Sequence, residues 1–395
     1  MASISEKVVV YLDTQDYSRF GDVLRRVSRD EEIDRVFREL VQFSDSGKVI
    51  FPTSFVIMSE LIQYDKEYRD TSLSKAQAVE TLSKGWSFIY PTEIIDLWRR
   101  SAEFCEWGKV GQSKLLNQGY GWYPNLDKIV KDLRSKKEER FYQFIESAKN
   151  RKERRYIKSK INKTPSIRDI DEIIAYEFGF VPKSFKNYIV NAIFGNKELS
   201  YSSLDLFKDV AAPVAFVKFY YEWSQGSKDM PFWAHKIGQG LITGIDKLVE
   251  ILKSIADDNN IQFQFEEFKN EFINIVHNEF LQDSISSGGF FAGRVPSEAG
   301  RLDENPSISV ISLVLCECLR SLVRKERGNS ILKPSLGGDI IHSMYLPYVD
   351  IWRGDRSFSE IVRSACPHYS SHVVHRLVEL PGQIRKVMIH KGISI

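Results

Sequence analysis

Acidic residues follow predicted strands near both ends of the chain. Asp13 comes directly after the apolar run 8–12, and Asp355 follows the short apolar segment 349–352. Asp339 opens a predicted helix shortly before that second segment. Acids at the carboxyl ends of strands in an open α/β sheet converge in one crevice. Because converging carboxylates repel each other, such a cluster needs a compensating cation, most simply Mg²⁺ or Mn²⁺. This combination indicates hydrolysis of phosphodiester bonds.

The elements that position these acids alternate along the first ninety residues. Residues 8–12, 48–51 and 86–90 are short runs rich in β-branched and aromatic residues, which is typical of buried strands. Ser28 and Glu31 form a capping-box pair that predicts the start of a helix between the first two strands. The order strand-helix-strand-helix-strand predicts a doubly wound parallel sheet.

A fourth acid lies on the helix predicted after the second strand. Ser54 is the expected start of this helix, which carries Phe55 and Met58 on one side and Glu60 on another. From about 94 to 304 the strand pattern disappears and helical periodicity dominates, which predicts a large helical insertion. Strand-like segments return at 349–352 and at 386–389.

The acids and their surroundings resemble a known family. Asp13, Glu60, Asp339 and Asp355 are similar in order and placement to the acidic quartet of PIN-like nucleases. The stretch Gly338-Asp339-Ile340-Ile341-His342, followed by Leu346-Pro347-Tyr348-Val349-Asp350, carries the most specific part of the resemblance. The resemblance covers roughly residues 5–92 and 306–395. It implies an α/β fold, a PIN-like three-layer sandwich with a central parallel sheet. Residues 1–93 and 306–395 would form its two parts, interrupted by a mainly α-helical insertion over 94–305.

The same resemblance implies a metal-dependent nuclease, with RNA favoured over DNA and endonucleolytic cleavage that leaves a 3′-hydroxyl and a 5′-phosphate. The residues expected to hold Mg²⁺ or Mn²⁺ or to orient the attacking water are Asp13, Glu60, Asp339 and Asp355. The residues expected to orient those ligands through hydrogen bonds are Asp16, His342 and Asp350. Two positions depart from the family pattern, because Gln15 replaces a common Asn or Ser and Gly354 replaces a common Thr or Ser.

Two other functions are compatible with parts of this pattern. Each acid alone could cap a helix or a turn, which would leave a non-catalytic nucleic-acid-binding or protein-interaction module on the same scaffold. A haloacid-dehalogenase-like phosphatase also begins with a strand that ends in Asp. That family needs further acids where this chain has Gln15 and Ser359.

Basic residues concentrate between 128 and 163. This span contains fourteen Lys or Arg and only five Asp or Glu. Such an excess could follow a phosphate backbone, although most charge runs are solvated helical faces. The residues chosen as nucleic-acid contacts are Lys149, Arg151, Lys152, Arg154, Arg155 and Lys158.

Composition limits which other classes of protein the chain could belong to. The chain has 395 residues, of which 43% are hydrophobic and 27% charged, which is typical of a globular protein. A net charge of +2 gives no global attraction to polyanions. Four cysteines without a Cys-x-x-Cys pair, and no stretch long enough to cross a bilayer, predict a cytoplasmic protein without membrane contact.

Three further features leave alternatives open. Cys366, His368, His372 and His375 have spacing that a zinc site can use, although a surface segment is the favoured interpretation. The glycine-rich loop 288–294 could form a lid. A homo-oligomer and a regulatory partner that moves the insertion both stay open.

Overall fold

The computed structural model describes most of the two terminal parts of the chain and a few segments between them. The described residues are 4–62, 66–91, 93–94, 114–123, 146–148, 150–155, 211–223, 306–324 and 336–394. Its strands are β1 (Val8–Tyr11), β2 (Val49–Ile50), β3 (Trp86–Phe88), β4 (Leu116–Gln118), β5 (Ile351–Arg353) and β6 (Val373–Val374). Its α-helices are α1 (Thr14–Leu24), α2 (Glu31–Asp45), α3 (Phe55–Glu60), α4 (Arg69–Ser83), α12 (Pro213–Trp223), α16 (Pro306–Arg324), α17 (Leu336–Ser343), α18 (Arg356–Ala365) and α19 (Leu380–His390). Short 3-10 helices are η1 (Ile4–Glu6), η2 (Lys66–Tyr68), η6 (Leu346–Tyr348), η7 (Pro367–His372) and η8 (Leu377–Glu379).

A parallel sheet joins the two ends of the chain. Its order is β2-β1-β5-β6, with Val9 opposite Ile50 on one side and Val10 opposite Ile351 on the other. A parallel bridge between Thr53 and Ser87 places β3 beside the chain that leaves β2. All side chains of β1 are fully buried, as expected for a central strand covered on both faces. The predicted mixed α/β fold with a central parallel sheet is therefore confirmed.

The direction in which successive strands are added reverses within this parallel sheet. From β1 the chain moves outward to β2 on one side, whereas from β5 it moves to β6 on the other. The boundary between β1 and β5 is therefore a topological switch point, where open α/β sheets form a crevice at the carboxyl ends of their strands. Asp13 and Asp355 follow the two strands that flank this point.

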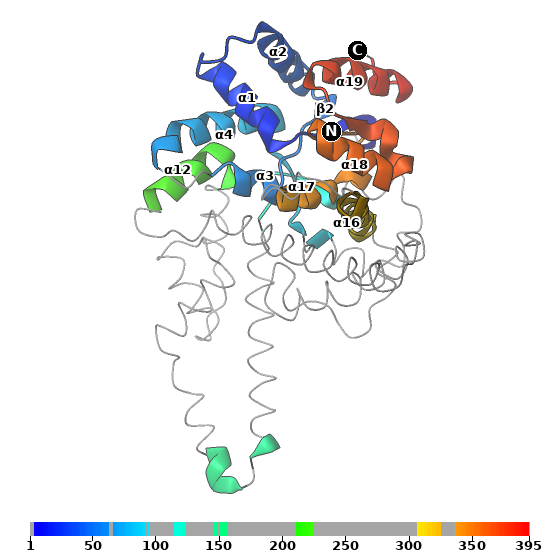
Figure 1. The fold of residues 1–395 in the computed structure, drawn as a ribbon. Coiled ribbons are helices and arrows are strands. Elements are labelled where there is room, and N and C mark those ends of the chain that lie inside the picture. The colour runs from blue at the N-terminus through cyan, green and yellow to red at the C-terminus, as the bar shows by residue number, and fades with distance from the viewer. Residues whose placement is uncertain are drawn as a thin grey trace.

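Two groups of helices flank the strands (Figure 1). Helices α1, α4 and α12 pack together as one group, and α16, α17 and α18 form the other. Gly21 allows the close approach of α1 and α4, because a Cβ at this position would lie 3.0 Å from the backbone nitrogen of Lys75. The two chain ends lie near each other (Figure 1), and Lys391 Nζ donates to Lys7 O at 2.9 Å.

Two strand predictions are corrected. Residues 386–389 belong to helix α19, in which Leu380, Ile384 and Met388 are buried four residues apart, so the period is helical rather than alternating. The last strand is β6 instead. The segment expected to contain no strands includes β4, which pairs antiparallel with β3. The rest of the predicted insertion lies largely outside the described residues.

None of the described helices combines the length and the apolar character that crossing a lipid bilayer would need.

Candidate functional site at the carboxyl ends of β1 and β5

Asp13 follows β1 and caps helix α1. Its backbone is extended, and its Oδ1 accepts a hydrogen bond from the amide nitrogen of Gln15 at 3.1 Å. Burial raises the pKa of Asp13, and nearby Glu60 adds to the rise, whereas His342 and Arg353 oppose it. Capping uses one carboxylate oxygen of Asp13, so the second oxygen is left for another ligand.

Asp355 has the same relation to β5 and α18. Its Oδ1 accepts from the amide nitrogen of Phe358 at 2.8 Å and so caps the helix. The glycine before it is explained by packing, because a Cβ on Gly354 would lie 2.4 Å from the indole of Trp352. That indole is almost completely buried, and its Nε1 donates to His342 O at 3.1 Å. The glycine at position 354 is therefore coupled to the large side chain at position 352.

Asp339 lies in the first turn of α17, near the other acids. Burial raises the pKa of Asp339 to about 8, and Asp13, Asp355 and Glu60 each add to the rise. A carboxyl group whose pKa is raised by three other carboxylates lies within their electrostatic reach. Asp339 is therefore within electrostatic range of the other three acids predicted from the sequence.

Glu60 ends helix α3 and is fixed from two directions. Its Oε2 lies 3.0 Å from His342 Nε2. Its Oε1 occupies the space above Gly338, where an added Cβ would approach to 2.3 Å. Burial alone would raise the pKa of Glu60. The charge and the hydrogen bond of His342, together with a hydrogen bond from Thr14 and the charge of Lys75, outweigh burial, so the net shift is downward.

His342 is the centre of a buried hydrogen-bonded chain. Its Nδ1 lies 2.7 Å from Tyr11 Oη, and that hydroxyl lies 2.8 Å from Ser54 Oγ. Burial lowers the pKa of His342, but the charge and the hydrogen bond of Glu60, together with the charges of Asp13 and Asp339, outweigh burial and raise the pKa to about 9. Protonated His342 donates from both ring nitrogens, to Glu60 and to Tyr11. The hydrogen bonds from Ser54 through Tyr11 to His342 therefore fix the position of Glu60 and keep it ionised.

Gly338→Ala tests this arrangement. The new methyl group is expected to displace Glu60 Oε1 and weaken its contact with His342. Because Glu60 raises the pKa of His342, that pKa is expected to fall in the variant when histidine protons are titrated by NMR. Gly382→Ala is the matched control, because a Cβ on Gly382 would meet no atom within 4 Å. An unchanged His342 pKa in Gly338→Ala would contradict the contact.

Asp16 forms a buried ion pair beneath the acids. Its Oδ1 lies 2.7 Å from Arg353 Nη2, and the two side chains are 0% and 2% exposed. Burial raises the pKa of Asp16 and Arg353 opposes this rise. Arg353 Nη1 also donates to the carbonyl oxygen of Gly354. The pair links the first turn of α1 with the last residue of β5.

Asp350 does not join this group. It precedes β5, so it lies at the amino end of the strand whereas Asp355 follows the carboxyl end. Its Oδ2 accepts from the amide nitrogen of Val9 and pairs with Lys391 Nζ at 2.7 Å. The prediction that Asp350 orients the other acids is wrong for this reason.

The histidines after α18 are engaged separately. His372 Nδ1 lies 3.0 Å from Val349 O, and His375 Nδ1 lies 3.4 Å from an Arg363 nitrogen. Cys366 is buried. This agrees with the interpretation of the segment as a structural connection.

The donor set of the four acids suits a hard divalent cation, because carboxylate oxygens are its preferred protein ligands. Asp13 and Asp355 each use one oxygen for capping, and Glu60 uses one for His342. Within the described ranges, no three His, Cys, Asp or Glu side chains are close enough together to hold one ion. A shared cation would therefore have to draw these carboxylates inward from the positions seen here.

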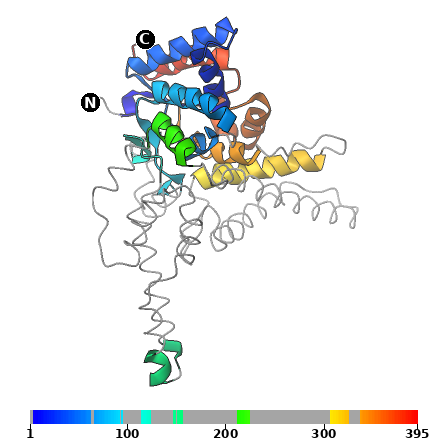
Figure 2. The ribbon, with the colours of Figure 1, turned by 90° about the vertical axis from the view of Figure 1, so that its left-hand side faces the viewer.

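The basic residues predicted from the sequence to contact nucleic acid lie away from the acids. Arg151, Lys152, Arg154 and Arg155 are exposed on one helical turn, which is drawn apart from the strands in Figures 1 and 2. Lys149 and Lys158 lie outside the described residues, as does the loop 288–294. The structure does not bring the four described basic residues to the acids.

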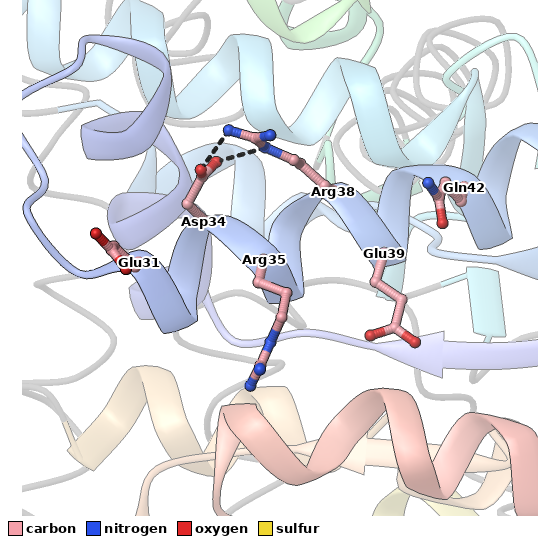
Figure 3. Close-up of a pocket in the computed structure, with 6 residues that line it drawn as sticks. All are labelled: Glu31, Asp34, Arg35, Arg38, Glu39 and Gln42. Carbon is pink, nitrogen blue, oxygen red and sulfur yellow. Dashed lines mark hydrogen bonds and ion pairs between the residues drawn. The ribbon is translucent and has the colours of Figure 1, made fainter.

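A shallow depression lies on helix α2, away from the acids (Figure 3). It has a volume of about 330 Å³ and is lined by Glu31, Asp34, Arg35, Arg38, Glu39 and Gln42. Its charged side chains have partners within the protein, since Asp34 pairs with Arg38 and Glu39 pairs with Arg385. These pairs, together with that of Arg35 and Glu32, use most of the charge that lines the hollow.

Sequence reasoning missed several residues around the acids. Tyr11 was assigned only to an apolar strand and Ser54 only to a helix start. Arg353 was not singled out. A charged residue inside an apolar segment, such as Arg353 after Trp352, is a usable signal, because arginine is rarely buried without a partner.

Comparison with known protein families, with curated proteins and with solved structures finds no significant match to this chain.

Proposed function

We propose that the chain is a metal-dependent nuclease that hydrolyses phosphodiester bonds of RNA at the carboxyl ends of β1 and β5. The observation that carries the proposal is that Asp339 lies within electrostatic range of Asp13, Glu60 and Asp355, which belong to or border three other elements. Structural acids are usually paired with cations, whereas the pKa of Asp339 is raised by three other acids. The strand order and the acid positions also support a PIN-like fold for the two terminal parts.

A bound Mg²⁺ or Mn²⁺ would neutralise charge on the phosphate and lower the pKa of the attacking water. Asp13, Asp339 and Asp355 supply the oxygens that would hold the cation. Glu60, kept ionised by His342, accepts a hydrogen bond from the attacking water and orients it towards phosphorus. In the hydrolysis, a bond forms between the water oxygen and phosphorus, the bond from phosphorus to the 3′-oxygen breaks, and a proton passes to that oxygen.

The test is a cleavage assay with purified protein and a labelled mixed-sequence RNA, in Mn²⁺, in Mg²⁺ and in EDTA. Cleavage is expected with either metal and not in EDTA. Asp13→Asn is expected to abolish it, because the amide cannot supply the lost negative charge. Asp45→Asn is the matched control, since Asp45 pairs with Lys84 on the surface. Products that carry a 5′-phosphate are expected. Full cleavage by Asp13→Asn would contradict the proposal.

The second candidate function is a non-catalytic binding module. The specific observation in its favour is that Asp13 and Asp355 do cap helices α1 and α18. A binder would retard the RNA in a gel without shortening it in any metal. Capping alone, however, gives no reason for Glu60 and Asp339 to lie beside the two caps.

A further inference from the structure

A helical turn at residues 151–155 concentrates positive charge on the surface. Four of its five residues are basic and exposed, namely Arg151, Lys152, Arg154 and Arg155. Asn150 caps this turn, since its Oδ1 accepts from the amide nitrogen of Glu153 at 2.9 Å and its carbonyl oxygen accepts from that of Arg154 at 3.0 Å. The cap satisfies backbone groups only, so the basic side chains are left to solvent.

The spacing of these basic residues brings like charges together. Residues three and four apart are neighbours on a helix, so Arg151 lies beside Arg154 and Arg155, and Lys152 lies beside Arg155. Like charges at this spacing repel each other and destabilise the helix. Among the residues that the structure describes, no acid forms an ion pair with any of the four. The turn therefore carries a repulsion that a bound anion would remove.

Exposed arginines elsewhere in the chain have a different arrangement. Four of them pair with an acid three or four residues away: Arg35 with Glu32, Arg38 with Asp34, Arg356 with Glu360 and Arg376 with Glu379. Alternation of acids and bases at this spacing is typical of a solvated helical face. Turn 151–155 lacks such pairs, so its charge is available to a partner.

Positive charge is also distributed unevenly along the sequence. The span 128–163 has a net charge of +9, whereas the whole chain has +2, so the remaining residues together carry −7. A polyanion is therefore attracted to this span and repelled by the rest of the chain. Turn 151–155 is the part of the span in which the structure describes the exposed basic side chains.

We infer that turn 151–155 binds the phosphate backbone of RNA at a position away from the bond that is cleaved. The turn lies apart from the strands that precede the acids (Figures 1 and 2). Lys and Arg contacts with phosphates give affinity without sequence preference. A helix that binds a membrane surface also needs an apolar face, and residues 151–155 include no apolar side chain. The inference rests on the proposed function for the choice of RNA and adds a second contact with that substrate.

The test measures RNA affinity as a function of salt, in EDTA so that the probe is not cleaved. The probe is a labelled mixed-sequence single-stranded RNA. The test variant replaces Arg151, Lys152, Arg154 and Arg155 by Gln. Each phosphate contact contributes about 0.7 to the slope of log affinity against log salt for a single strand, so the slope is expected to fall by about 3. The control variant has the same change in net charge on other exposed arginines, namely Arg26→Gln, Arg29→Gln, Arg35→Gln and Arg38→Gln, and is expected to retain the slope.

The outcomes separate this inference from the proposed function. An unchanged slope in the folded test variant overturns the role of the turn even if the wild-type protein cleaves RNA. A reduced slope together with no cleavage by the wild-type protein supports the phosphate contacts and overturns the nuclease. An equal reduction in the control variant assigns the affinity to net charge and overturns the inference. Binding of the wild-type protein to phosphatidylserine vesicles but not to RNA also overturns it. Circular dichroism and thermal melting show whether both variants are folded.

Discussion

Asp339→Asn is expected to abolish cleavage and to make the metal-free protein more stable. The pKa of Asp339 in the folded protein is about 8 because burial and the other acids disfavour its charge. Asparagine removes that unfavourable charge but also removes a ligand for the cation. Loss of activity with a gain in stability is the signature of a residue retained for function at a cost in stability.

The gain in stability of Asp339→Asn over wild type should increase as the pH rises. An unfolded aspartate has a pKa of about 3.9. The stability that accompanies protonated Asp339 is fully present below this value, and it is lost as the pH rises from about 4 to about 8. The variant should therefore exceed wild type by roughly 5 kcal/mol near pH 8 and by little near pH 4.

Urea denaturation at the two pH values, in EDTA, measures this difference. Addition of Mn²⁺ should reverse the order, because a cation that binds only the folded wild type stabilises it by mass action. Asp45→Asn again provides the control, since Asp45 is an exposed partner of Lys84. If Asp339→Asn destabilises the metal-free protein at pH 8, the carboxylate has a structural partner and the acids are not a cation site.

The central sheet could be predicted because its signals are local. The run 8–12 is continuously apolar, and β1 is fully buried on both faces. The order of the acids after the strands then followed from the rule for open α/β sheets. Element β6 could not be predicted in this way, because Val373–Val374 is too short to show a period. A four-residue helical repeat of Leu380, Ile384 and Met388 was likewise hidden by the short apolar run at 387–389.

The supporting contacts depend on residues that are distant in sequence. Tyr11 and His342 are 331 positions apart, and nothing local indicates that their side chains meet. Asp350 was misplaced because proximity in sequence to Asp355 does not imply proximity in space. A strand separates the two residues, and a strand advances about 3.3 Å per residue. Packing of Trp352 against Gly354 is equally invisible without the fold.

Arg353→Met is expected to cause the largest loss of stability among these variants. Arg353 and Asp16 are 2% and 0% exposed, so removal of the arginine leaves a buried carboxylate without its cation. Loss of one partner from a buried ion pair typically costs about 3–5 kcal/mol. Because the pair joins the first turn of α1 to the end of β5, next to Asp13 and Asp355 in the chain, the variant should also bind Mn²⁺ more weakly than wild type.

A double-mutant cycle separates the pair from the packing of its members. Asp16→Asn combined with Arg353→Met removes the unpaired charge, so the double variant should be more stable than Arg353→Met alone. Urea denaturation gives the free energies, and Mn²⁺ titration of the double variant shows whether α1 and β5 still hold the acids together. A restored stability without restored Mn²⁺ affinity would identify the pair as a device that positions Asp13 and Asp355. If the two single losses simply add in the double variant, the ion pair contributes nothing of its own and α1 and β5 are held together by other contacts.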